Sequence, residues 1–416
     1  MKPDVGAISQ RERDAIEAGG RPGSRLTSID ALRGAVMIVM ALDHVRDFFH
    51  AGAMSFSPTD LAKTTPILFF TRWITHFCMP VFMFTAGAGA YLWWRHRRNT
   101  KGQLSRFLWT RGLWFVVLEL TVMQLAYNFN VSRRFMVLLI ILWIFGICMI
   151  AMAALVHLRM SWLLAASITV IALHNCLDGI QASRFGSGAW LWEMIHQPGV
   201  FNFAGRSVLV PYPLLPWVAV MAAGFCFAQV FEWAPADRGR FMRRLGLAAV
   251  IAFFVLRVLN HYGDPAPWSI QRSAAFTVLS FLNCTKYPAS LDFLLMTLGP
   301  ALLALAYLDR HQPKSENPLV IFGRVPMFYF VLHFYLIHGL MAIMAWLRYG
   351  NAALHFVFNP PPSMGAPAQL FPQNFGYSLP VTYAMWIAVI VILYPLCRWY
   401  AGVKAKHRSW WWLSYL

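Results

Sequence analysis

Long apolar stretches separated by short polar connections run along the whole chain. Each stretch holds about 20 mostly apolar residues, the length at which an α-helix crosses a hydrocarbon core of roughly 30 Å. The pattern predicts about ten membrane-spanning helices, at residues 29–49, 66–94, 104–127, 135–157, 161–177, 210–233, 241–260, 287–308, 318–347 and 379–402.

Composition agrees with an all-α, polytopic integral membrane helix bundle. Of the 416 residues, 58% are hydrophobic and only 12% are charged, whereas soluble domains carry about 25% charged residues. The connections are too short for a second soluble domain, so we expect one helical domain at residues 25–403. We expect residues 1–24 to form a disordered cytoplasmic tail and residues 404–416 a short cytoplasmic C-terminal tail.

Lysine and arginine are unevenly divided between alternate connections. With the N-terminus in the cytoplasm, cytoplasmic segments hold about three times as many of them as external segments, which predicts that both termini are cytoplasmic. The net charge of +18 is then explained by basic loops against anionic lipid, with no nucleic-acid partner. The protein is therefore expected to be a multi-pass membrane protein, with the lipid bilayer as its first partner.

The six cysteines are dispersed and include no C-x-x-C pair. Neither a disulfide framework nor a zinc site is indicated, and we expect no metal.

Ionisable side chains inside membrane spans are costly, so they are functional-site candidates. Here they fall into two layers. The layer near the cytoplasmic face holds Asp30, Arg33, Arg111 and Arg324. The layer in the external half holds Asp43, His44, Asp47, Arg72, His76, Glu119, Arg257, Lys286, Asp292, and His333 or His338.

Helical spacing indicates which of these groups act together. Asp30 and Arg33 share a helix face, which fits either a salt bridge that fixes the helix end or a ligand site. Asp43 and His44 border the same side of the first span, and His44 and His76 lie in the external halves of adjacent antiparallel spans. A histidine with a nearby carboxylate there is typical of a general base or a proton relay.

Several segments resemble one family. They are SIDALRG, LDHVRDFF, HFCMPVFMFTAGAGAYL, VPYPLLPWVAVMAAG, NCTKYPASLDFLLMTLGPALL and FGRVPMFYFVLHFYLIH. Together they are similar to the bacterial branch of the heparan-alpha-glucosaminide N-acetyltransferase catalytic-domain family, within the transmembrane acyltransferase superfamily. The resemblance covers about residues 25–400.

The resemblance implies that acetyl-CoA is used from the cytoplasmic side and that its acetyl group reaches an amine or hydroxyl of a sugar or glycan on the external side. The family uses a histidine near the outer end of the first span. His44 aligns with an asparagine of the lysosomal member, whose histidine aligns with Ser55, and His50 lies nearby. His44 and His50 both stay candidates for the base, and the acyl chain, the acceptor and a homodimer stay open.

In the mechanism that follows, Arg33, Arg111 and Arg324 hold the phosphates of coenzyme A. His44 deprotonates the acceptor, Asp43 orients His44, and His76 or Lys286 stabilises the oxyanion of the tetrahedral intermediate. Together with Lys286, the residues expected to bind the acceptor are Tyr287, Asp292 and His338.

A proton-coupled transporter of a small polar or glycan-related solute is the alternative. Intramembrane ionisable groups beside the proline-interrupted segments CMPVF and GRVPMF also fit broken helices around a transport site. No internal repeat relates the two halves of the chain, which favours the acyltransferase.

Overall fold

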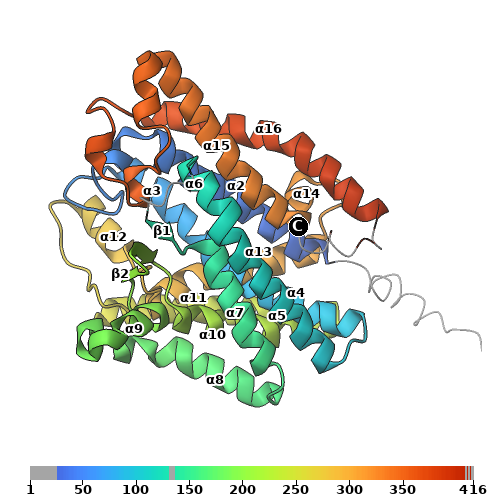
Figure 1. Ribbon diagram of the computed structural model, residues 1–416. Coiled ribbons are helices and arrows are strands. Elements are labelled where there is room, and N and C mark those ends of the chain that lie inside the picture. Colours follow the sequence, from blue (N-terminus) through green and yellow to red (C-terminus); the bar gives the residue numbers. More distant parts are fainter. Residues whose placement is uncertain (1–25, 131–135, 408–409, 411–412, 414–416) are drawn as a thin grey trace, which may run out of the picture.

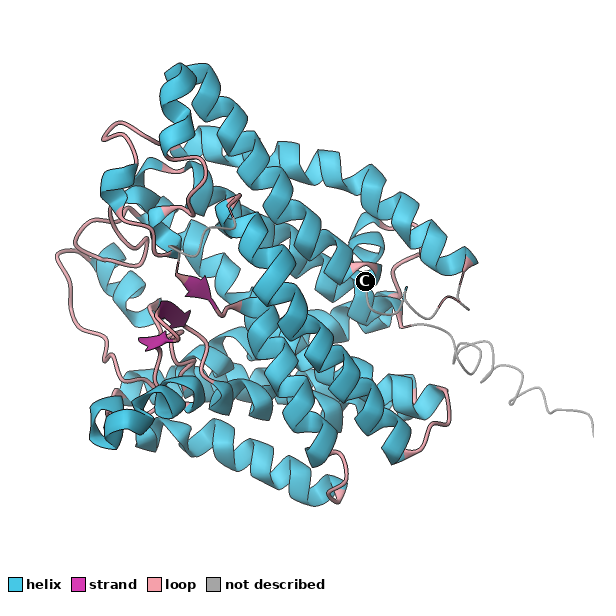
Figure 2. Ribbon diagram, in the orientation of Figure 1, coloured by secondary structure: helices cyan, strands magenta, loops and turns pink. Residues whose placement is uncertain are grey.

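The computed structural model describes residues 26–130, 136–407, 410 and 413, and nearly all of them are helical (Figures 1 and 2). The helices are α2 Thr27–Phe49, α3 Pro66–Trp73, α4 Cys78–His96, α5 Lys101–Leu118, α6 Gln124–Asn128, α7 Ile141–Leu155, α8 Met160–Leu173, α9 Ala189–Ile195, α10 Leu214–Phe227, α11 Pro235–Leu259, α12 Ala274–Leu282, α13 Leu291–His311, α14 Pro318–Arg324, α15 Pro326–Tyr349 and α16 Leu379–Lys406. The tail expected at residues 1–24 lies outside the described residues.

Six helical stretches of the described residues are long and apolar enough to cross a membrane. They are Pro66–His96, Met160–Leu177, Leu214–Glu232, Leu291–His311, Pro326–His355 and Leu379–Lys406. Ile141–Leu155 is apolar but shorter, and α2 carries several charged residues along its 23-residue length. The larger number of about ten spans and the cytoplasmic placement of both termini stay predictions.

A small three-stranded sheet overlaps the first residues of two predicted spans. It has the order β1-β3-β2, in which β1 (Val137–Leu138) runs parallel to β3 (Arg206–Val210) and β2 (Gly199–Phe203) runs antiparallel to β3. Residues 135–157 and 210–233 were each predicted as helix throughout. Their first residues are partly used for the sheet instead, so α7 and α10 begin later, at Ile141 and Leu214.

Two further predicted spans are helical but distorted. The prediction of one helix at 318–347 was wrong at Val325, which has φ −128° and ψ 48° and separates α14 from α15, because a residue before proline avoids the helical region. Residues Glu119–Met123 form a π-helical turn between α5 and α6. The buried Glu119 carboxylate accepts the main-chain N–H groups of Leu142 at 2.7 Å and Trp143 at 3.2 Å, and so caps the start of α7.

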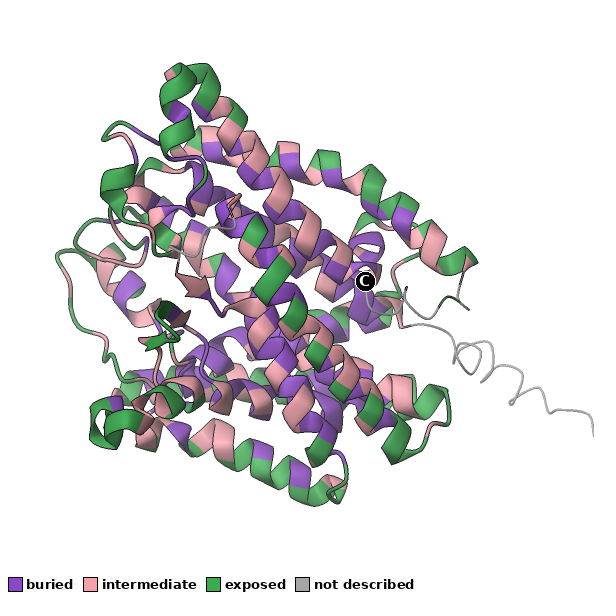
Figure 3. Ribbon diagram, in the orientation of Figure 1, coloured by how far each residue is buried: buried purple, intermediate pink, exposed green. Residues whose placement is uncertain are grey.

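Helix α2 lies in the interior, and most of its residues are buried, whereas α8 and α16 expose many residues (Figure 3). It packs closely on α14 through two glycines. A Cβ at Gly34 would overlap the carbonyl oxygen of Leu319, and a Cβ at Gly323 would overlap the carbonyl oxygen of Asp30. This backbone contact between α2 and α14 fixes the relative position of the polar side chains that the two helices carry.

Candidate active site

A cavity of about 570 Å³ lies between the first half of α2, helices α4, α5 and α7, and the junction of α14 with α15. Its lining includes the three arginines predicted for one layer, Arg33, Arg111 and Arg324. We call it the basic cavity. Its other charged or ionisable lining residues are Asp30, His96, Arg97 and Lys404.

Arg33 is held by helix α4. Its Nε donates to Oγ1 of Thr85 at 3.1 Å, and its Nη2 donates to the main-chain carbonyl of Thr85. Gly89, one turn further along α4, leaves room for the guanidinium, because a Cβ there would lie 2.9 Å from Nη2 of Arg33. The planar group is therefore fixed in the cavity wall between α2 and α4.

Arg324 and Arg111 enter the cavity from two other elements. Nη2 of Arg324 donates to Oγ of Ser315 at 2.8 Å, and its Nε lies 3.9 Å from Oδ2 of Asp30. The guanidinium carbon of Arg111 lies 4.9 Å from the ring centre of Phe107. All three arginines line the cavity, and a guanidinium is the side-chain group best suited to phosphate oxygens.

The far part of the basic cavity is apolar and approaches a histidine pair. Met37, Met40 and Phe330 are among its lining residues. Met40 precedes His44 by about one helical turn on α2, and Phe330 precedes His333 by nearly one turn on α15. The cavity thus leads from a basic end to within about a turn of both histidines.

His44 and His333 form a direct hydrogen bond. Nδ1 of His44 lies 2.6 Å from Nε2 of His333, and Nδ1 of His333 lies 3.1 Å from the main-chain carbonyl oxygen of Tyr329. The ring of Phe334 stacks on that of His44 with centres 4.2 Å apart. His333 is fully buried, whereas His44 is partly exposed.

The carboxylates next to His44 are neutralised by arginines. Asp43 accepts from Nη2 of Arg46 at 2.9 Å and forms a second ion pair with Arg72. The same Arg46 nitrogen lies 2.8 Å from Asp47. We expected Asp43 to orient His44, but its hydrogen bonds go to arginines, and the described hydrogen-bond partner of His44 is His333.

Lys286 and Tyr287 lie beside this ion-pair cluster. Nη2 of Arg72 lies 3.4 Å from the Tyr287 hydroxyl, which lies 3.3 Å from the Tyr212 hydroxyl. Nζ of Lys286 lies 5.2 Å from the ring centre of Tyr287 and 5.8 Å from that of Tyr212. Tyr287 is 38% exposed, whereas Lys286 is buried at 9% exposure, so the ring of Tyr287 lies between the cluster and the molecular surface.

His76 is buried and does not form the predicted pair with His44. Its ring lies against Phe293, with ring centres 5.3 Å apart, and its Nδ1 has no hydrogen-bond partner in the described part of the chain. The short helical turn Ile74–Phe77, which joins α3 to α4, sets this direction.

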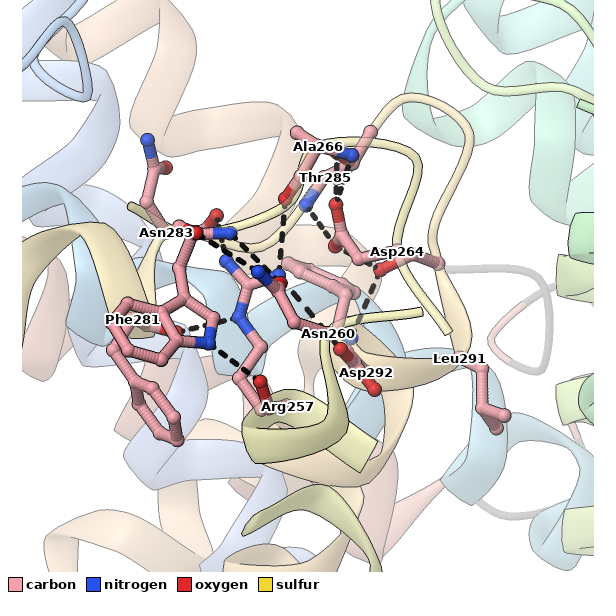
Figure 4. Close-up of polar contacts among 12 residues, drawn as sticks. Arg257, Asn260, Asp264, Ala266, Phe281, Asn283, Thr285, Leu291 and Asp292 are labelled. Atoms are coloured by element: carbon pink, nitrogen blue, oxygen red, sulfur yellow. Dashed lines mark hydrogen bonds and ion pairs between the residues drawn. The ribbon is translucent and has the colours of Figure 1, made fainter. Parts of the chain in front are cut away.

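Asp292 belongs to a network that holds the loop between α11 and α12 (Figure 4). One of its oxygens lies 3.8 Å from Nη1 of Arg257, whose guanidinium donates to main-chain carbonyls that include those of Ser280 and Phe281. Asp264 in the same loop accepts from the hydroxyl of Ser290 at 2.6 Å. Arg257 therefore satisfies carbonyls at the end of α12, and Asp292 supplies its counter-charge.

His338 has both ring nitrogens engaged by the main chain. Nδ1 lies 2.8 Å from the carbonyl oxygen of Ala126 and Nε2 lies 2.8 Å from that of Val357. Its ring stacks on Phe129 with centres 3.8 Å apart. This geometry ties α15 to α6 and to the segment after α15, and it leaves no ring nitrogen for an acceptor.

His50, the other candidate for the base, follows the last residue of α2. Its ring Nδ1 accepts a hydrogen bond from the main-chain N–H of Gly52 at 3.1 Å, and its own main-chain N–H donates to the carbonyl oxygen of Arg46. Burial and the charge of Arg46 lower the pKa of His50. His50 thus caps the turn Ala51–Met54, away from the apolar end of the basic cavity.

Two residues of the site carry more weight than the sequence suggested. Arg46 joins both carboxylates at the end of α2, and His333 bonds to His44. A signal for His333 is present in the chain, because Arg33 precedes His44 by nearly the same number of residues as Arg324 precedes His333. The two spacings are 11 and nine residues, so if the two helices run in the same direction, both histidines lie at similar depths.

Among the described residues, no group of three or more His, Cys, Asp or Glu side chains is arranged to hold a metal ion. All six cysteines are unpaired.

One comparison with known proteins gives a match. The family model described as heparan-alpha-glucosaminide N-acetyltransferase, catalytic, matches residues 25–263, which is more than half of the chain. The matched range includes Arg33, His44 and Arg111 and ends before α13 and α15. No curated protein matches the chain.

Proposed function

The chain belongs to the heparan-alpha-glucosaminide N-acetyltransferase catalytic-domain family, and from this premise we propose that it transfers an acetyl or other short acyl group across a membrane, from acyl-CoA to a sugar. Family membership implies a membrane-embedded acetyltransferase. The acyl-CoA donor, the amine or hydroxyl of the acceptor sugar, and the roles of individual residues are the proposed part.

The observation that carries the proposal is the shape of the basic cavity. Coenzyme A joins a nucleotide with several phosphate groups to a long, narrow arm that ends in the thioester. The cavity has arginines from three elements at one end and an apolar end about one helical turn from His44. Charge-assisted hydrogen bonds from Arg33, Arg111 and Arg324 would hold the phosphates, and the arm would extend toward His44.

His44 is the proposed general base. The acceptor nitrogen or oxygen attacks the thioester carbon while His44 takes its proton, and the sulfur then leaves with that proton as the coenzyme A thiol. Two observations support this role over His50: His44 lies about one turn beyond the apolar end of the cavity, and Nδ1 of His50 is already used by the main-chain N–H of Gly52.

The acceptor would bind on the other side of His44, at Arg72, Lys286 and Tyr287. These residues combine positive charge with a partly exposed aromatic ring, which suits a sugar with polar substituents. Asp292 and His338 would act on this site indirectly, by holding the loop between α11 and α12 and helix α15. His76 is buried near Arg72 and Lys286, and Lys286, which is more exposed than His76, is the proposed oxyanion donor.

The proposed orientation places the basic cavity toward the cytoplasm, because acyl-CoA is a cytoplasmic metabolite and the connections on that side are rich in arginine. The Arg72–Lys286 region would then face the outside of a bacterial inner membrane.

The test measures acyl transfer and donor binding in purified protein. We expect acetyl-CoA to raise the melting temperature of the detergent-solubilised protein and the wild type to acetylate amino-sugar acceptors. Arg111→Gln should weaken the acetyl-CoA-induced rise, since it removes a charged donor fork from the cavity. Arg106→Gln on the same helix is the matched control, because Arg106 is exposed and does not line the cavity.

A transporter would give a different result. The helix break at Val325 beside the cavity is the feature that fits it. In that case acetyl-CoA would not change the melting temperature, and proteoliposomes would accumulate a solute without acylating it. That outcome would reject the acyltransferase proposal.

A further inference from the structure

The proton positions in the His44–His333 pair are set from one end by a main-chain carbonyl. Nδ1 of His333 lies 3.1 Å from the carbonyl oxygen of Tyr329. A carbonyl only accepts, so Nδ1 of His333 carries a hydrogen, and Nε2 of a neutral His333 carries a lone pair. The ring is fully buried among aromatic neighbours, including Phe334 at 4.5 Å between ring centres, where a charged imidazolium without an anion is costly.

The tautomer of His333 determines the tautomer of His44. Nε2 of His333 accepts, so Nδ1 of His44, 2.6 Å away, is the donor of this bond. A neutral His44 then has its lone pair on Nε2. None of the hydrogen bonds of the described residues engages that atom, and His44 is the partly exposed member of the pair.

We infer that His333 is a positioning residue for His44: it keeps the lone pair of His44 on Nε2 and shares the positive charge when Nε2 takes a proton. The inference rests on the proposed acyl transfer. In that reaction the acceptor atom forms a bond to the thioester carbon and gives its proton to Nε2 of His44. The carbon–sulfur bond breaks, and the sulfur takes the same proton to become the thiol.

During this cycle the hydrogen bond between the two histidines spreads the positive charge of protonated His44 over both rings. When Nε2 of His44 is protonated, the proton on Nδ1 of His44 shifts toward Nε2 of His333, while Nδ1–H of His333 keeps donating to the carbonyl oxygen of Tyr329. The proton returns when the thiol forms, so no other reactant is needed. Asp43 does not supply this hydrogen bond, since its oxygens are bonded to Arg46 and Arg72.

The charged groups that act on His44 are Asp43, Lys286 and Arg72, and they belong to α2, to the loop before α13 and to α3. They act through space. His333 contacts His44 directly through a hydrogen bond. Replacing His333 by leucine therefore removes the control over which nitrogen of His44 carries the hydrogen, while the charges of Asp43, Lys286 and Arg72 stay in place.

The experiment compares His333→Leu, His333→Gln and wild type in kcat and in the melting-temperature rise caused by acetyl-CoA. Glutamine accepts the His44 Nδ1–H with its side-chain oxygen but cannot take up a proton, and leucine does neither. We expect His333→Leu to lose about 100-fold in kcat, the low end of what general-base catalysis contributes, and His333→Gln to lie between leucine and wild type. Both variants should keep the rise in melting temperature that acetyl-CoA causes.

The control is His157→Gln, at an exposed histidine on the turn before α8. Its kcat and its melting-temperature rise should equal those of the wild type.

A second measurement needs only His333→Gln, should the leucine variant fail to fold. The dependence of kcat on the deuterium fraction of the solvent should be curved in wild type, where two protons move, and linear in His333→Gln. Wild-type kcat in His333→Leu, or equal losses in both variants together with loss of the acetyl-CoA effect, would overturn the role of His333 and leave the acyltransferase function standing. A wild-type protein that transfers no acyl group would instead reject the function and this inference with it.

Discussion

Arg46 is the residue that makes the charged end of α2 tolerable in the protein interior. One of its nitrogens lies 2.9 Å from Asp43 and 2.8 Å from Asp47, and its side chain is only 5% exposed. Arg72 neutralises Asp43 a second time from α3. Two carboxylates near His44 are thus paired with arginines, and the histidine itself is not used for this pairing.

Replacing Arg46 by methionine should destabilise the protein strongly. Asp47 would lose its cation in a buried site, and breaking one partner of a buried ion pair typically costs about 3–5 kcal/mol. Arg46→Lys should lose less, because one cationic nitrogen can still serve both carboxylates. Thermal unfolding of the purified variants in detergent measures this, with the exposed Arg106→Met as control. Equal melting temperatures for the Arg46→Met and Arg106→Met variants would contradict the role of Arg46.

At the scale of helices, the contact between α2 and α14 sets the width of the basic cavity. Gly34 and Gly323 each face a main-chain carbonyl of the other helix. Arg33 on α2 and Arg324 on α14 both line the cavity, so this backbone contact fixes how far apart their main chains lie.

A methyl group at Gly34 should push the two helices apart. Overpacking of this kind costs about 1–3 kcal/mol, and the shift should also weaken acetyl-CoA binding. Gly402→Ala in α16 is a matched control, because a Cβ there meets no atom within 4 Å and alanine favours a helix by about 1 kcal/mol over glycine. Melting temperatures with and without acetyl-CoA separate the two effects. A Gly34→Ala variant with unchanged stability and binding would show that the contact is not needed.

At the scale of the whole molecule, transfer across a membrane requires that the basic cavity and the Arg72–Lys286 region face opposite sides of it. Cysteines introduced at two exposed positions test this. In a Cys176→Ser background, Ser183→Cys before α9 should react with a membrane-impermeant maleimide in intact cells, whereas Ala236→Cys at the start of α11 should react only after lysis. Labelling of both, or the reverse pattern, would reject the orientation.

The sequence alone predicted where several helices lie in the chain and which side chains lie at the same depth along them. Runs of apolar residues located α2, α8 and α16 to within a few residues, and the positions of Arg33, Arg111 and Arg324 near one end of their spans predicted that they share a layer. Depth is readable because each residue advances a helix by a constant rise.

What the sequence did not provide is the direction of each side chain around its helix and its main-chain partners. His44 bonds to His333 across 289 positions of the chain, and His338 is taken up by two carbonyls from distant segments. Asp292 and Glu119 likewise serve the backbone of loops and helix starts. Such contacts depend on how the helices pack, and single-sequence spacing does not encode that.

The most direct test of the central claim is a structure of the protein with a non-hydrolysable acetyl-CoA analogue. We predict phosphate groups on Arg33, Arg111 and Arg324, the arm along Met37 and Met40, and the carbonyl carbon of the analogue close enough to His44 for an acceptor to lie between it and Nε2. An analogue bound at Arg72 and Lys286, or one whose carbonyl carbon lies far from His44, would contradict the account.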